Sequence, residues 1–587
     1  MDPQSDLTFV RDLVSIRDEL VRHDLDSVIW WRHPPVVVKV LLVTDGALDF
    51  GIGDFGLQTF VTALLNDGRF YVRFELTLAH LRSDVAEMQM MSAEPRISRR
   101  IKDFRFDNPE NFAPDMYDEV WLFGFETSFH IASYATRNSD RRTYPAERLG
   151  DAELVALSEH MNSGRGIFAT GDHGSLGRGL CGSVSRVRKM RRWESFVIAG
   201  EDEVGMINAR RNDTNRIGND PGTQFSDQSD DIPQILDLLL YSSRLGFFQN
   251  ARYPHPVLCS KFGRIDVFPD HPHEGECIAS SSLDSQYPFD GSEEWPAGIG
   301  PEIIATSRVP SGNTARSTKM PTKVATQAHS FGAVCAYDGH RAGVGRVVTD
   351  ATWHHFVNVN LIGVVEGGGF DEFAAFPDES TTKHSGFLAT SAGAAAFRKI
   401  KEYYVNLGVW LATPELISSF NSHFWLDLVY TDRLMESTLL TPHVEFESIR
   451  PNVFYYIGVH ARDVLGRKAS PCQTVEFLLD WLKLVWVEVI DDIDPWASFS
   501  SEQTRAPLPW YDLQPLIDTA IGGALVAVRQ AMPYPSGEAS ENQLKGSVDI
   551  AVQGGRRALA IALREAIEDH RALGDLLNNA AHSMPAE

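Results

Sequence analysis

The chain has 587 residues, and because 43% of them are hydrophobic it has enough apolar content for two or three folded domains. Its 79 acidic residues outnumber 54 basic ones, and a net charge of -25 excludes a general binder of nucleic acids or anionic membranes, because phosphates attract positive surfaces. The first residues do not resemble a signal peptide and no apolar stretch is long enough to span a bilayer, so we expect a cytoplasmic protein.

Residues 1–34 are expected to form an N-terminal helix, because apolar side chains recur at helical spacing before the Pro34-Pro35 break. The core begins after this break with a β-branched run at 36–43, which is typical of a buried strand. Further strands are predicted at 71–76, 119–124, 166–170, 302–306, 333–337 and 345–349. Helical patterns at 57–65 and after Asp151 alternate with the first of these strands, so we predict an α/β domain at 35–365 with a doubly wound, mostly parallel sheet. The strand at 166–170 should be central.

Three later regions depart from this alternation. The polar insertion at 208–232 is either a loop that covers a substrate or a disordered segment. Residues 366–395 are rich in Gly, Ser, Thr and Ala and are predicted to be a linker. Residues 396–587 show 3.6-residue spacing and should form an additional, mainly helical C-terminal domain, through which the protein could form a homo-oligomer.

The strand at 166–170 ends in a glycine-rich turn that indicates a site. In Gly171-Asp172-His173-Gly174-Ser175, a polar turn follows the carboxyl end of a buried strand, where open α/β sheets bind their ligands. Asp172 and His173 are therefore candidate catalytic residues. Gly174, Ser175 and Arg178 could bind a substrate anion through backbone N–H groups and positive charge. A helix-capping turn without function is the alternative.

A second candidate is the segment from Asp270 to Glu276, which contains His271, His273 and Glu274. Two histidines at i, i+2 can converge on one metal ion when the backbone is extended, and a carboxylate can complete the shell. This pattern indicates a divalent metal such as zinc. A surface loop with two ordinary histidines explains the segment equally well, because Pro272 disfavours a strand.

A third candidate follows the strand at 345–349. Asp350 and His354 would lie at the same sheet edge as the turn after 166–170 if the two strands are parallel, and could act as catalytic partners. Trp353, His355 and Asp45, which follows the first strand, are candidate substrate-binding residues. Histidines that pack on Trp353 are the alternative.

Basic residues cluster in an otherwise acidic chain at Arg178, Arg186, Arg188, Lys189, Arg191 and Arg192. They could bind a phosphate or carboxylate, although a solvated helix face is the more common outcome and is favoured here. Cys181 between two glycines is a minor candidate for a nucleophile, since the same basic residues could stabilise its thiolate.

The order of elements resembles the class I glutamine amidotransferase-like superfold and, within it, the trehalose-utilisation (ThuA-like) family. The resemblance covers residues 36–362. It is carried by Asp45-Gly46, Tyr117-Asp118-Glu119-Val120-Trp121, Gly171-Asp172-His173-Gly174, His271-Pro272, Gly345-Arg346-Val347 and Trp353-His354-His355. It implies an α/β fold and a role in carbohydrate metabolism. His173 stands where amidotransferases carry their Cys nucleophile, so the resemblance does not imply glutamine hydrolysis.

These observations together predict hydrolase-like acid/base chemistry on a small polar compound, sugar-like or anionic, at the sheet edge, assisted by a metal if the two histidines bind one. His173 would be the base or a ligand, with Asp172 and Asp350 as its partners. The alternative is a non-catalytic ligand sensor or assembly protein that retains the pocket, and it is favoured because the middle position of the turn holds His173 and not a Ser or Cys nucleophile.

Overall fold

The fold is described from a computed structural model and divides into two compact units. The sheet unit comprises residues 37–240 and 254–417, and the helical unit comprises residues 241–253 and 418–587 with the N-terminal residues. The structure describes residues 35–66, 69, 71–129, 148–172, 175–193, 234–242, 252–269, 275–280, 282–309, 329–363, 386–429, 431, 434, 438, 444–496, 513–532 and 541–583.

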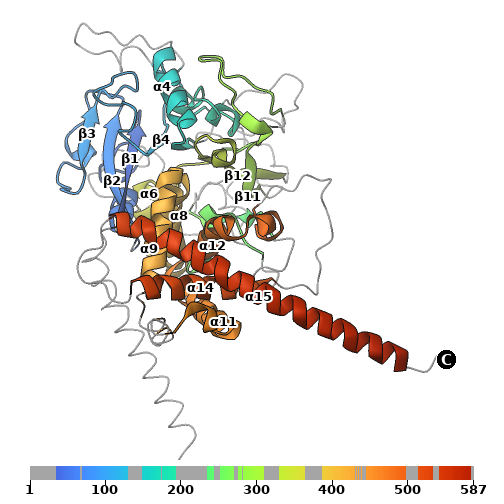
Figure 1. Ribbon diagram of the computed structural model, residues 1–587. Helices are drawn as coiled ribbons and strands as arrows, with labels where there is room; N and C mark the ends of the chain where they lie inside the picture. Colours follow the sequence, from blue (N-terminus) through green and yellow to red (C-terminus); the bar gives the residue numbers. More distant parts are fainter. Residues whose placement is uncertain are drawn as a thin grey trace, which may run out of the picture. The chain divides into compact units, whose positions relative to one another are not determined.

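A nine-stranded sheet forms the centre of the sheet unit, with the order β3-β2-β1-β4-β5-β13-β12-β11-β7. Figure 1 labels several of its strands, among them β1, β2, β3 and β4. Its strands are β1 (Val36–Thr44), β2 (Val72–His80), β3 (Arg99–Lys102), β4 (Glu119–Phe123), β5 (Gly166–Thr170), β7 (Asp237–Leu238), β11 (Glu302–Val309), β12 (His329–Tyr337) and β13 (Val347–Asp350). Two ribbons accompany it, β6 (Gln234–Ile235) with β10 (Val267–Phe268) and β8 (Cys259–Ser260) with β9 (Gly263–Arg264).

The sheet is mixed. The run β1-β4-β5-β13 is parallel, as is the pair β2-β3, whereas β12, β11 and β7 pair antiparallel. All five residues of β5 are buried, which agrees with the prediction of a central strand whose two faces are covered. The predicted α/β class is confirmed.

Helices cover both faces of the sheet. Those of the sheet unit are α2 (Gln58–Asn66), α4 (Asp151–Asn162), α5 (Arg178–Cys181), α6 (Asn358–Ile362) and α8 (Ser391–Leu411). Helix α8 contacts α2, β5 and β13, so this part of the chain after residue 390 packs with the sheet. Its side chain Tyr404 joins a buried aromatic cluster with Phe60 and Phe356, whose rings lie 4.8 to 5.2 Å from that of Tyr404.

The helical unit is built from α11 (Pro451–Lys468), α12 (Pro471–Val485), α13 (Ile490–Ile493), α14 (Gln514–Ala531) and α15 (Glu541–Ser583), and the division between the units falls within α9 (Pro414–Val429). Small residues allow α14 and α15 to pack closely. A Cβ atom on Gly523 would lie 2.2 Å from the Cβ of Ala558, and one on Gly554 would lie 2.3 Å from that of Ala527. The predicted helical C-terminal region is therefore present.

No helix in the described part of the chain combines the length and apolar character needed to cross a membrane. The predicted N-terminal helix, the insertion at 208–232 and most of the predicted linker lie outside the described residues.

Candidate functional site

Three aspartates mark the carboxyl ends of neighbouring strands in the sheet. Asp45 directly follows β1, Asp172 lies two residues after the end of β5, and Asp350 is the last residue of β13. Because β1, β4, β5 and β13 are parallel, these ends share one edge of the sheet. Between β1 and β4 the order of strands changes direction: β2 and β3 lie on one side of β1, and β4, β5 and β13 lie on the other. Doubly wound sheets bind ligands at such an edge. All three side chains are buried, so each depends on its neighbours for hydrogen bonds.

Asp172 and His354 form the most chemically suggestive pair at this edge. The Oδ2 of Asp172 lies 3.4 Å from Nε2 of His354, and their side chains are only 1% and 7% exposed. Thr352 donates its hydroxyl hydrogen to Asp172 Oδ1 at 3.1 Å and accepts from the His354 backbone N–H at 3.2 Å. On the far side of the ring, His354 Nδ1 lies 2.8 Å from Oδ1 of Asn360. Residues 172 and 354 are thus brought together as the sequence predicts.

The partners of His354 define its protons. The Asn360 oxygen can only accept a hydrogen bond, so Nδ1 carries a hydrogen and donates it. Without a second proton, the Nε2 lone pair would face a carboxylate oxygen in a buried position, which is repulsive. A proton between His354 Nε2 and Asp172 Oδ2 would remove this repulsion. An ion pair or hydrogen-bonded pair of this kind can release and recover a proton during a reaction.

Asp350 and His355 form a second pair, which is completely buried. Nε2 of His355 lies 2.9 Å from Asp350 Oδ2, and Tyr403 donates its hydroxyl hydrogen to the same oxygen at 3.1 Å. The imidazole stacks on Phe268, with ring centroids 4.0 Å apart and planes inclined by 7°. Because neither side chain is exposed, we interpret this pair as part of the support beneath the edge, whereas His355 was predicted to bind substrate.

Asp45 holds the loop that follows β4. Its Oδ1 accepts hydrogen bonds from the backbone N–H groups of Phe125, at 2.5 Å, and Glu126, at 3.4 Å. Burial, with a smaller contribution from the nearby charge of Glu126, raises the pKa of Asp45 to about 8, although the hydrogen bonds from the backbone oppose this shift. At neutral pH this carboxyl is therefore mostly protonated and can also donate a hydrogen bond.

Arg191 joins the ends of β5 and β13 from within the protein. Its side chain is buried and donates to the backbone oxygens of Asp172 and Ala351, both at 2.7 Å, and of Asp350 at 3.1 Å. The guanidinium also lies over the ring of Trp193, 4.6 Å from its centroid. This buried cation positions the two strand ends that carry the aspartates.

Close backbone contacts in the turn after β5 explain why positions 171 and 177 are glycines. The Asp172 N–H donates to the Leu176 oxygen, and a Cβ atom on Gly171 would lie 2.4 Å from that oxygen. Gly177 has a φ of 92° and approaches the end of β4, where Gly124 leaves room for it. The backbone N–H of Trp353 donates to the Gly171 oxygen at 3.0 Å, which ties the third candidate segment to this turn.

His173 and Gly174, predicted as a catalytic residue and an anion-binding residue, lie outside the described residues. Ser175 and Arg178 are half-buried beside the turn. The helix that follows, α5, has only four residues, so it provides little of the N-terminal field that binds anions at longer helices.

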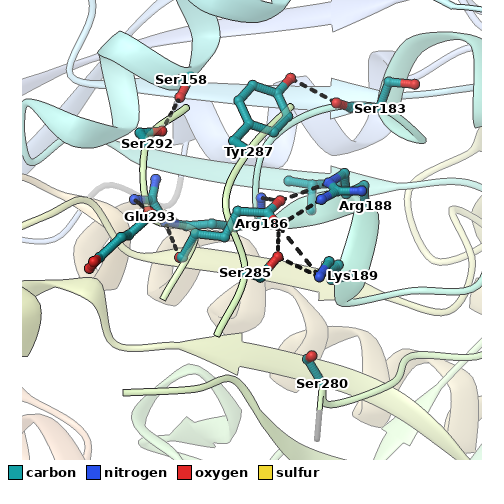
Figure 2. A network of polar contacts seen from close by, with 12 residues as sticks. Ser158, Ser183, Arg186, Arg188, Lys189, Ser280, Ser285, Tyr287, Ser292 and Glu293 are labelled. Carbon is teal, nitrogen blue, oxygen red and sulfur yellow. Dashed lines mark hydrogen bonds and ion pairs between the residues drawn. The ribbon is translucent and has the colours of Figure 1, made fainter. Parts of the chain in front are cut away.

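The basic cluster is a buried structural network, and the prediction of a solvated helix face is wrong for its central members. Glu294, which is fully buried, accepts two hydrogen bonds from Arg188 at 2.8 Å and one from Ser285 at 2.6 Å. Arg186 is also fully buried and donates from Nε to the Glu294 backbone oxygen at 2.8 Å. Figure 2 shows Lys189 beside Ser285, to which it donates at 2.5 Å. These charges hold the segment around residue 290 and are not available for an anionic ligand.

The structure gives no support to Cys181 as a nucleophile, and it does not describe the predicted metal ligands. Burial raises the pKa of the Cys181 thiol well above its usual range, and the charge of Asp45 adds to this, so the residue is not a reactive thiolate. The predicted metal ligands His271, His273 and Glu274 lie outside the described residues. Among the residues that the structure describes, no group of three or more His, Cys, Asp or Glu side chains could hold a metal ion.

Sequence reasoning missed the uncharged residues of the site. Thr352 lies in the motif that contains His354, and its spacing of two residues before a histidine could have indicated a local hydrogen bond. Asn360 comes from α6 and Tyr403 from α8, and nothing in their sequence surroundings connects them with the edge.

Comparison of the chain with family models, curated proteins and solved structures finds no match.

Proposed function

We propose that the carboxyl edge of the sheet catalyses hydrolysis, or related acid/base chemistry, of a small polar compound that is sugar-like or anionic. The observation that carries the proposal is a line of contacts: Thr352 donates to Asp172, Asp172 Oδ2 lies 3.4 Å from His354 Nε2, and His354 Nδ1 lies 2.8 Å from Asn360 Oδ1. It supports a hydrogen on Nδ1 and places the other ring nitrogen next to a carboxylate, an arrangement that suits general acid/base catalysis.

In this proposal a proton held between Asp172 and His354 passes to the leaving group as its bond to the substrate breaks. A water molecule then bonds to the substrate through its oxygen and gives a proton back to the pair. Asn360 and Thr352 keep the two side chains oriented throughout. Arg191 stabilises the strand ends next to the developing charge, and His173, which directly follows Asp172, is the sequence candidate for direct contact with the substrate.

A substrate screen tests this function. Purified protein is incubated with small esters, amides, glycosides and phosphate monoesters, and product is measured for the native chain and the His354→Gln variant. We expect turnover of at least one class and a loss of roughly 100-fold or more in the variant, because a positioned general acid or base contributes about that factor. The exposed His582 provides a matched control, and His582→Gln should retain full activity. Equal turnover by the native chain and His354→Gln would contradict the proposal.

The second candidate is a ligand sensor. The specific observation in its favour is that the described ionisable side chains Asp172 and His354 are almost completely buried. A compound that raises the temperature of unfolding of the native chain and is recovered unchanged would support a sensor, whereas its conversion to product supports the enzyme.

A further inference from the structure

The C-terminal half of α15 carries an apolar stripe that the other described residues leave uncovered. From residue 564 to 579, every side chain except Ala566 is exposed, and Figure 1 shows the helix continuing past the helices that it packs against. Ile567 and Leu573 are each 51% exposed, and Leu577 is 58% exposed. The members of the stripe are Leu563, Ala566, Ile567, His570, Leu573, Gly574 and Leu577. Their spacing of three and four residues places them on one face of the helix.

The opposite face is charged. Arg564, Glu568, Arg571 and Asp575 follow one another at spacings of three or four residues, so that opposite charges are neighbours along the helix. This face suits water, and the contrast between the two faces predicts that the stripe binds a partner.

Gly574 supplies independent evidence for contact on the stripe. No atom of the described chain lies within 4 Å of the position that its Cβ would occupy, so packing within one chain does not require glycine here. A glycine inside an exposed helix costs about 1 kcal/mol relative to alanine. The small residue is explained if a large side chain of another molecule packs on it.

The pattern of the stripe identifies that molecule as a second copy of the chain. The sequence of the stripe is symmetric about His570. Leucines lie seven residues to each side, at 563 and 577. The small residues Ala566 and Gly574 lie four residues away, and the large apolar residues Ile567 and Leu573 lie three residues away. A two-fold axis at His570 would align two copies of the helix antiparallel. On helical geometry, Leu573 of one copy then faces Ala566 of the other, and Ile567 faces Gly574. Each large side chain meets a small one, as close helix packing requires.

We propose that the chain forms a homodimer through residues 563–577 of α15, paired antiparallel about His570. The interface is isologous, because the same stripe contributes both surfaces.

Sedimentation of the full-length protein over a range of concentrations tests the proposal. We expect the native chain to be a dimer, and both Ala566→Lys and Leu573→Glu to weaken it by at least about tenfold, since each places a charge in an apolar contact. The double variant should regain much of the affinity, because the introduced ammonium of one copy would face the introduced carboxylate of the other. In a parallel pair the same double variant would place like charges together and gain nothing.

Glu565→Lys and Ala572→Glu provide the matched control, because they introduce the same charges at the same seven-residue spacing but outside the stripe. Both should leave the dimer unchanged, and circular dichroism should show native helix content for all variants. A monomeric native chain at every concentration, unaffected single variants or a double variant without recovery would each overturn the proposal.

Discussion

At the level of single residues, the edge shows how three aspartates acquire different properties from their surroundings. Asp45 faces backbone N–H groups in a fully buried position, Asp172 faces a hydroxyl and an imidazole, and Asp350 faces Tyr403 and His355. Carboxyls in different surroundings at one sheet edge can take different roles in a site. Asp172 is the member of this set that has both an oriented histidine and a place next to the predicted catalytic turn.

The raised pKa of Asp45 makes a prediction about stability. Between about pH 4 and pH 8 the folded carboxyl keeps its proton while the unfolded one loses it, so the folded state binds more protons. This group therefore lowers the free energy of unfolding as pH rises, by up to about 1.4 kcal/mol per pH unit, and the loss is complete above pH 8. Asp45→Asn keeps an oxygen that can accept from Phe125 and does not titrate.

We expect urea unfolding between pH 5 and pH 8 to show a shallower decline for Asp45→Asn than for the native chain. Asp84→Asn is the control, because its carboxyl is largely exposed and has a lowered pKa. Parallel declines for native protein and Asp45→Asn would show that Asp45 is ionised in the folded state.

At the level of elements, Arg191 connects two strands that are distant in the sequence. Its guanidinium satisfies backbone oxygens at the ends of β5 and β13, and no other described side chain donates to the Ala351 oxygen. Arg191→Met would remove these donors from buried acceptors, so we expect the free energy of unfolding to fall by roughly 3 to 5 kcal/mol.

The neighbouring Arg192 is a matched control for this substitution. Its side chain is 28% exposed and pairs with Glu276 at 2.8 Å, so Arg192→Met should cost less than about 1 kcal/mol in the same urea titration. Similar losses for both variants would contradict the role assigned to Arg191.

The helices and strands could be predicted from the sequence where the pattern of apolar residues is clear. The apolar β-branched run of β1 and the buried run of β5 indicated strands, and the order of strands and helices indicated the α/β class. The glycines of the turn after β5 indicated the sheet edge at which Asp172 and His354 meet. The basic cluster was misjudged because Glu294, which pairs with Arg188, lies about a hundred residues away. Asn360 and Tyr403 could not be predicted, since only tertiary packing brings them to Asp172 and Asp350.

At the level of the whole molecule, the two proposed roles, chemistry and self-association, belong to different elements. A net charge of -25 disfavours polyanionic partners. The ion pairs of Arg188 with Glu294 and of Arg192 with Glu276 agree with this, because these basic side chains pair within the protein. The apolar stripe on α15 then provides for self-association, while the sheet edge carries the proposed chemistry. The two proposals are independent, because a variant in the stripe leaves every described residue of the edge unchanged.

The central claim is that Asp172 and His354 share one proton, and nuclear magnetic resonance of protein labelled with ¹⁵N in its histidines tests it directly. The His354 signals are assigned by their absence in His354→Gln. We predict a hydrogen on Nδ1 and, at Nε2, a nitrogen that is protonated or hydrogen-bonded at neutral pH. In Asp172→Asn, loss of the carboxylate should shift His354 to an ordinary neutral imidazole. A free Nε2 lone pair in the native protein, unchanged in Asp172→Asn, would contradict the shared proton and the acid/base site built on it.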